Sequence, residues 1–216
     1  MREHGLEPVP GLPEELPRGE ALLWQGAPDF RALCIHAMHV RALAAYFVLL
    51  MLLRGQLEWA GGAGLAAAVA STTWLGILGV ICIAIACTFA WLYSRTTLYT
   101  ITTRRVVVRT GIALDVAVNL PFKQIHAAGL RHYRSGGGEI TLETLGERVS
   151  YLLLWPSVRP WRFNRPQAML RALPAPDAVA TLLGEALARA QAERGAEAAA
   201  ASEPATVPVA GTAAAA

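Results

Sequence analysis

The chain has few charged residues, and one long stretch has none. Only 16% of its 216 residues are charged, 54% are hydrophobic, and the mean hydropathy is +0.38. A soluble domain usually carries about 25% charged residues. Residues 61–94 contain no Asp, Glu, Lys or Arg, and about 20 apolar residues in a helix suffice to cross a bilayer. The composition therefore argues against an ordinary soluble enzyme.

Lysine and cysteine are scarce as well. Lys123 is the single lysine among 19 basic residues, a bias that fits a GC-rich bacterial genome better than an arginine code for nucleic acid. The three cysteines, Cys34, Cys82 and Cys87, form no CxxC motif, so no disulfide framework is predicted. We interpret them as small apolar core residues.

A cleavable signal sequence is also missing. Such a signal needs a positive start followed by an apolar core, whereas residues 1–31 are rich in proline and carry three Arg against six acids. We therefore expect residues 1–32 to form a cytoplasmic N-terminal segment.

Residues 33–94 predict a two-helix transmembrane hairpin with spans at about 40–59 and 73–93. Trp74 lies near one end of the second span, and Trp91 and Tyr93 lie at the other, as expected at two membrane interfaces. The first span has a shorter apolar centre and ends near the pair Arg54 and Glu58. A core-packed or interfacial helix is the alternative for this segment.

Positive residues predict the orientation of the hairpin. Arg31 and Arg41 precede it and Arg95 follows it, whereas the connecting loop has only Arg54, offset by Glu58. Cytoplasmic loops carry the excess of Arg and Lys. We therefore expect a multi-pass protein of the bacterial inner membrane with both termini in the cytoplasm.

Residues 95–194 change to short β-branched runs separated by turns. Segments 98–102, 105–109, 113–120, 126–133, 139–144 and 148–155 each resemble a strand, and such spacing is typical of an antiparallel sandwich or barrel. Asp177 then begins a run with apolar residues at i, i+3 and i+4. The predicted fold class is a membrane α-helical hairpin plus an α+β domain: a small antiparallel β-barrel or sandwich capped by a C-terminal helix. Residues 195–216 are too poor in large apolar groups to fold.

Several segments together resemble a known family. Residues 99–125, YTITTRRVVVRTGIALDVAVNLPFKQI, resemble the bacterial pleckstrin-homology-like domain. With residues 19–29 (GEALLWQGAPD), 39–47 (HVRALAAYF) and 155–187 (WPSVRPWRFNRPQAMLRALPAPDAVATLLGEAL), the chain resembles the PuhB-type photosynthetic complex assembly proteins of purple bacteria. The resemblance covers roughly residues 8–188. It implies a non-catalytic factor of the intracytoplasmic membrane that aids assembly of the reaction centre and its core light-harvesting complex, whose subunits would be its partners.

The sequence shows no catalytic constellation. No serine stands in a GxSxG setting, and Gly136, Gly137 and Gly138 lack the Lys-Ser/Thr of a phosphate loop and are interpreted as a hairpin turn. Cys34, His36 and His39 could suggest a metal or haem site, or a histidine ligand to bacteriochlorophyll. We favour the interpretation that they are polar residues at a membrane interface. We expect no enzyme activity and no cofactor.

The candidate contact residues are basic and aromatic. Three interpretations compete: a partner protein, anionic lipid at the bilayer surface, and nucleic acid, which the membrane anchor disfavours. Alternation of Arg with Trp and Phe is typical of protein interfaces. The candidate residues are Arg95, Arg104, Arg105, Arg109, Trp155, Arg159, Trp161, Arg162, Phe163 and Arg165.

A second functional class stays open beside the assembly factor. It is a generic membrane-anchored adaptor whose pleckstrin-homology-like domain binds lipid or peptide. Small residues of the second span, such as Gly76 and Gly79, permit close helix approach, to a partner helix or in a homo-oligomer.

Overall fold

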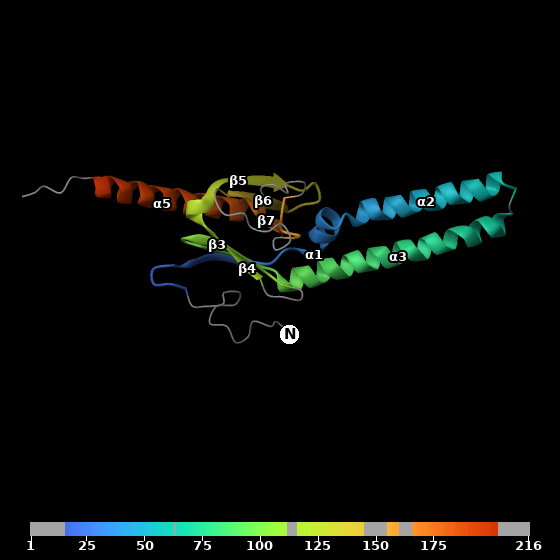
Figure 1. Ribbon diagram of the computed structural model, residues 1–216, viewed down its shortest axis with the longest axis horizontal. Helices are drawn as coiled ribbons and strands as arrows, with labels where there is room; N and C mark the ends of the chain where they lie inside the picture. The colour runs from blue at the N-terminus through green and yellow to red at the C-terminus, as the bar shows by residue number, and fades with distance from the viewer. Residues whose placement is uncertain (1–15, 63, 112–115, 145–154, 160–165, 203–216) are drawn as a thin grey trace, which may run out of the picture.

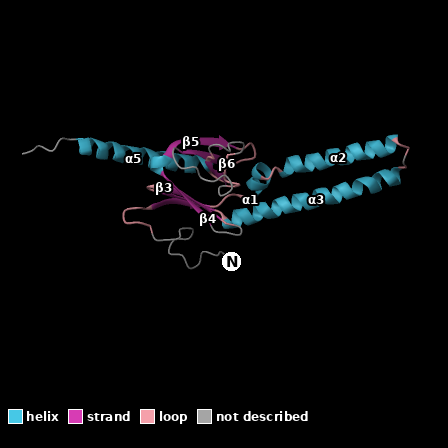
Figure 2. Ribbon diagram, viewed as in Figure 1, coloured by secondary structure: helices cyan, strands magenta, loops and turns pink. Residues whose placement is uncertain are grey.

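A computed structural model describes residues 16–62, 64–111, 116–144, 155–159 and 166–202, as a helical hairpin attached to a small domain of two sheets and one helix (Figure 1 and Figure 2). The elements in chain order are β1 (Leu22–Gly26), α1 (Phe30–Ala32), the π-helical turn η1 (Leu33–Ala37), α2 (Val40–Ala60), α3 (Leu65–Thr96), β2 (Leu98–Thr102), β3 (Arg105–Thr110), β4 (Val116–Pro121), the 3-10 turn η2 (Phe122–Gln124), β5 (Ile125–His132), β6 (Gly138–Thr144), β7 (Ala168–Leu173) and α5 (Pro176–Ser202).

The two hairpin helices run side by side away from the domain (Figure 1). Both are long and apolar enough to cross a membrane. Helix α2 agrees with the predicted span, but α3 begins at Leu65 rather than near Thr73. The added turns are rich in alanine, the strongest helix former, and the hydroxyl of Thr72 donates a hydrogen bond to the Ala68 carbonyl.

Small residues of α3 pack against α2 within the hairpin. A Cβ added to Gly79 would lie 2.9 Å from Cγ of Phe47, and one on Gly76 would lie 3.3 Å from Cε of Met51. Ala90 is fully buried at the base of the hairpin. These residues therefore hold the two helices of one chain together, while large apolar side chains such as those of Leu57 and Val80 remain exposed on the outside.

The domain contains two antiparallel sheets, ordered β1-β2-β3-β4 and β5-β6-β7. Buried side chains of both sheets meet in one core, where Tyr99, Leu120, Leu142 and Leu170 pack together. Leu183 of α5 is fully buried in the same core, so α5 closes the sandwich. The predicted antiparallel sandwich with a C-terminal helix is confirmed, and over the described residues its two sheets do not join into a closed barrel.

The N-terminal segment differs from its prediction, because residues 22–26 form a strand of the first sheet. Strand β1 pairs with β2, with Trp24 opposite Ile101 and Gly26 opposite Tyr99, and Gln25 donates a hydrogen bond to Oγ1 of Thr100 at 3.1 Å. The hairpin is thus a long insertion between two neighbouring strands. The domain begins before the hairpin and resumes after it, rather than starting at residue 95.

Residues 148–154 of the predicted strand 148–155 lie outside the described residues, and Trp155 lies in a turn. Two differences concern the rest of the C-terminal half. Strand β7 is an addition to the predicted strands. Helix α5 runs to Ser202, so residues 195–202 differ from the predicted unfolded tail; the segment consists mainly of alanine, which has the highest helix propensity. Residues 203–216 lie outside the described residues.

Candidate functional site

A buried hydroxyl cluster joins the hairpin to both sheets. The hydroxyl of Tyr93, near the end of α3, lies 2.5 Å from Oγ of Ser157, and the hydroxyl of Tyr99 in β2 lies 2.9 Å from the same atom. The backbone N–H of Arg171 in β7 donates to the Tyr99 hydroxyl at 3.2 Å. All three hydroxyl-bearing residues are at most 1% exposed. Because buried hydroxyls are costly without partners, this cluster fixes the angle at which α3 leaves the domain.

A second contact joins the start of the hairpin to the β5–β6 turn. The imidazole of His36 in η1 stacks on the Tyr133 ring, with centroids 3.8 Å apart and planes inclined by 9°. Its Nε2 lies 2.9 Å from Oγ of Ser135. The predicted hairpin turn at the three glycines is confirmed, since the Tyr133 N–H donates to the Gly137 carbonyl between β5 and β6. Helix α2 therefore also begins against the domain.

A buried carboxylate lies behind this stack. Glu139 is 5% exposed and accepts hydrogen bonds from the Tyr133 hydroxyl at 2.7 Å and from Nη1 of Arg131 at 3.1 Å. Nε of Arg171 lies 3.9 Å from Oε2 of Glu139. Among the described residues this nitrogen is buried without a hydrogen-bond partner. The charge of Arg171 thus depends on Glu139 for compensation.

Burial favours the neutral forms of four titratable side chains at the junction. Burial, together with the hydrogen bond to Glu139, raises the pKa of Tyr133 well above its usual value, and burial likewise raises the pKa of Tyr99. Burial lowers the pKa of His36. The pKa of the Cys34 thiol rises to about 11, first through burial and then through Cys87. These groups are packed as uncharged structural parts rather than as acids, bases or nucleophiles.

The side chains of Cys34, His36 and His39 make contacts within the chain. In the described ranges no three His, Cys, Asp or Glu side chains converge as metal ligands would. The sulfur atoms of Cys34 and Cys87 lie 4.0 Å apart, and Nδ1 of His39 lies 3.1 Å from the Ala37 carbonyl oxygen. His36 is occupied by the Tyr133 stack. The structure thus gives each of these side chains a packing or hydrogen-bonding partner within the chain.

The predicted contact residues that the structure describes do not lie on one surface. Arg95 is exposed at the end of α3, with its guanidinium 5.5 Å from the Trp91 ring centroid. Arg104 and Arg105 lie at the opposite end of β2, about 17 Å further on at 3.3 Å per strand residue. Their nearness to the hairpin in sequence therefore does not place them beside the bilayer. Nε of Arg105 also forms an ion pair with Glu20 at 2.8 Å.

The remaining candidates divide between buried, bonded and exposed positions. Arg109 is 8% exposed in β3 and has interaction partners of its own. Arg159 donates to Oε1 of Gln167 at 2.9 Å and lies 3.6 Å from Glu143. Trp155 is 49% exposed, two residues from Ser157 and thus near the base of the hairpin. The candidates outside the described residues are Trp161, Arg162, Phe163 and Arg165.

Sequence reasoning missed one exposed cation at the hairpin base. Arg134 lies between Tyr133 and Ser135, the two residues that contact His36, and it is exposed. With the exposed residues Arg31, Arg41 and Arg95, at the ends of the hairpin segments, it makes up what we call the basic collar; Asp29 and Asp177, whose Oδ1 lies 2.8 Å from Nε2 of His132, are exposed acids near it. Only the register of the β5–β6 turn against η1 brings Arg134 there, so a local motif could not have identified it.

Two antiparallel sheets closed by a C-terminal helix define the class of the domain, and comparison with known proteins gives the family. The sequence profile of the family described as bacterial PH domain matches residues 39–187. The chain therefore belongs to the bacterial PH domain family. This match includes the helical hairpin as well as most of the sandwich.

The chain is also similar to two individual proteins. It is 37% identical over 191 residues to an uncharacterized 23.7 kDa protein in the puhA 5′ region of Rhodobacter capsulatus, covering 86% of this chain and 89% of the relative. A solved structure of a DUF1696 family protein with a pleckstrin-homology domain, from Shewanella loihica PV-4, is 12% identical. The superposed region covers 43% of this chain and 68% of the Shewanella chain, with a TM-score of 0.29.

Proposed function

We propose that this protein is a non-catalytic membrane assembly factor that aids assembly of the photosynthetic reaction centre and core light-harvesting complex. The observation that carries the proposal is the relative in the puhA 5′ region, which is 37% identical over nearly its whole length. The position of this relative's gene beside puhA favours a role linked to photosynthesis. The resemblance of the N-terminal and 155–187 segments to PuhB-type proteins supports the same role.

In this proposal the hairpin spans the inner, intracytoplasmic membrane with both termini in the cytoplasm. The distribution of charge supports the orientation, because the basic collar of Arg31, Arg41, Arg95 and Arg134 surrounds the base of the hairpin. The tip carries Arg54 and Glu58, which form an ion pair four residues apart on α2. Cations on the domain side and a neutral tip agree with the positive-inside rule, and each collar arginine near anionic lipid contributes about 1 kcal/mol.

The hairpin would then present its outer faces to nascent membrane subunits. Gly76 and Gly79 already pack against side chains of α2. Partner helices would therefore contact the exposed large side chains instead. Ile77, Ile81 and Ile85 lie four residues apart along one side of α3 and are about half exposed. Dispersion contacts of such side chains support helix association in lipid. The hydroxyl cluster and the His36 stack would hold the domain at a fixed position over the subunits being assembled.

Affinity purification of the tagged full chain from photosynthetically grown cells, in mild detergent, tests this function. We expect reaction-centre or core antenna subunits, identified by mass spectrometry and near-infrared absorption, to be enriched at least tenfold over an untagged control. The tagged double variant Ile81→Ala/Ile85→Ala should recover less than the matched variant Arg189→Ala, whose change lies on the exposed side of α5. Enrichment of lipid and unrelated proteins alone would instead favour a generic membrane-anchored adaptor.

A further inference from the structure

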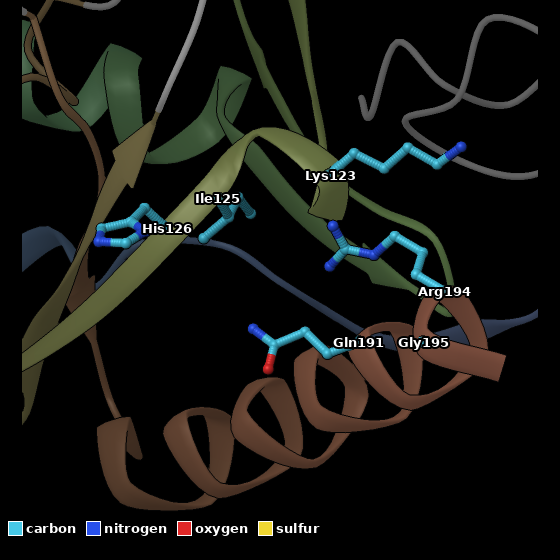
Figure 3. Close-up of a pocket in the computed structure, with 6 residues that line it drawn as sticks. All are labelled: Lys123, Ile125, His126, Gln191, Arg194 and Gly195. Atoms are coloured by element: carbon cyan, nitrogen blue, oxygen red, sulfur yellow. The ribbon is translucent and has the colours of Figure 1, made fainter. Parts of the chain in front are cut away.

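The end of the domain remote from the hairpin carries a basic groove (Figure 3). It consists of two adjoining hollows of about 390 and 380 Å³ that share Lys123 and Arg194. The first lies between η2, the start of β5 and the C-terminal half of α5, where Ile125 and Gln191 line it. The second extends to the β2–β3 turn, where Arg104 joins the lining.

The charges of this groove are unbalanced. Arg105 and Glu20 in the second hollow neutralise each other through their 2.8 Å ion pair. This leaves Arg104, Lys123 and Arg194 against Glu193. Among the described residues, the charged ends of Arg104 and Lys123 have neither an ion pair nor a hydrogen bond. The groove is therefore a place where an anion would gain charge-assisted hydrogen bonds without displacing existing ones.

Part of the groove is already held in place for binding. Nε of Arg194 donates to the Ala190 carbonyl at 3.0 Å, which fixes the guanidinium against the end of α5. Figure 3 shows the Arg194 side chain reaching from α5 across to the turn that carries Lys123, with the Gln191 amide one turn earlier on the same helix. A partly ordered guanidinium loses less conformational entropy on binding than a free one.

We propose that this basic groove binds an acidic peptide segment of a partner protein. The three unbalanced cations come from three separate elements and two hollows, so a run of spaced carboxylates fits them better than one small anion. The groove also lies at the opposite end of the domain from α2 and α3 (Figure 1), and its ligand must come from the aqueous phase. Of the described lining residues, Phe122 is buried and His126 offers a single exposed ring, so the groove lacks the series of aromatic side chains on which the bases of a nucleic-acid strand would stack.

Fluorescence anisotropy with the full chain in neutral detergent micelles tests the groove. The probe is a labelled octapeptide of alternating Glu and Gly, titrated at about 50 mM salt, a concentration at which screening is weak. We expect saturable binding that Lys123→Glu/Arg194→Glu weakens at least tenfold. The single variants Lys123→Glu and Arg189→Glu have equal net charge; the first should weaken binding, and the second, outside both hollows, should bind within twofold of the original chain, while circular dichroism confirms that all variants are folded.

Four outcomes would overturn the proposal. They are the absence of saturable binding, equal weakening by Lys123→Glu and Arg189→Glu, displacement of the peptide by millimolar inorganic phosphate, and tighter groove-dependent binding of a single-stranded oligonucleotide of the same length. The assay contains no photosynthetic subunit, so its failure leaves the proposed assembly role standing, and failure of that role leaves the groove standing.

Discussion

The two ends of the domain use polar residues in opposite ways. At the hairpin end, the polar groups of Tyr93, Ser157 and Glu139 are buried and bonded to one another or to neighbouring strands. At the remote end, the charged groups of Arg104 and Lys123 are exposed and have no partner among the described residues. Buried, satisfied networks hold one geometry, whereas open charges are available to a ligand. The comparison therefore assigns rigid attachment to one end and recognition to the other.

The path of the chain explains why the hairpin end needs rigidity. Both helices connect directly into paired strands, since η1 follows β1 closely and α3 is followed at once by β2. A change in the angle between the helices would pull on the β1–β2 register. It also follows that a fragment of residues 95–194 lacks strand β1 and exposes an edge of the first sheet, so binding experiments need the full chain.

The largest effect on stability should come from Glu139, and Glu143 on the same strand serves as its comparison. Glu139→Ala at the hairpin end leaves Arg171 and the Tyr133 hydroxyl without their buried partner, and we expect the free energy of unfolding to fall by about 3 kcal/mol. Glu143→Ala toward the other end removes a half-exposed ion pair with Arg159 and should cost less than about 1 kcal/mol. Denaturant unfolding in detergent measures both, and equal losses would contradict the contrast between the two ends.

An intermediate effect should follow loss of the shared hydroxyl. Ser157→Ala deprives the buried Tyr93 hydroxyl of its partner, although the Tyr99 hydroxyl keeps its bond from Arg171. We expect a loss of about 1–2 kcal/mol. Lys123→Ala in the basic groove should stay within about 0.5 kcal/mol of the original chain, as exposed substitutions usually do. Thermal unfolding compares the two variants, and a larger loss for Lys123→Ala would reverse our assignment.

Elements with strong local patterns could be predicted from the sequence, and long-range pairings could not. Helix α2 follows from its apolar run, and β2 and β3 from β-branched residues such as Val106 and Val108. Strand β1 is a short segment whose partner lies about 75 residues later. No local sequence pattern predicts the pairing of β1 with β2, because that pairing depends on the hairpin bringing the two strands together.

The candidate site shows the same limit at single residues. Arg104 and Arg95 are close in sequence, but the length of β2 carries them to opposite ends of the domain. The sequence suggested a ligand or an interfacial role for His36, and the structure adds that its ring stacks on Tyr133, nearly a hundred residues away. A lone polar residue carries no information about its distant partner, so these roles depend on the tertiary structure.

The smallest effect, a pH dependence, separates the His36 stack from the rest of the junction. Burial is the main cause of the lowered pKa of His36; Arg131, Arg41 and His39 act in the same direction, and Glu139 opposes them. His36 therefore binds fewer protons in the folded than in the unfolded chain at pH values between its lowered pKa and the ordinary value of about 6.5, and its contribution to stability is lost as the pH falls through that interval.

His36→Phe keeps a ring to stack on Tyr133 but cannot take up a proton. We expect its unfolding temperature to fall less between pH 7.5 and pH 5.5 than that of the original chain, because the carboxylates common to both chains contribute equally. Ser135→Ala removes the hydrogen bond to Nε2 but keeps the imidazole, so it should retain the original pH dependence. If His36→Phe and the original chain lose the same stability on acidification, the imidazole is already accessible to protons in the folded state. The hairpin end of the domain would then be more accessible to solvent than its buried hydrogen bonds indicate.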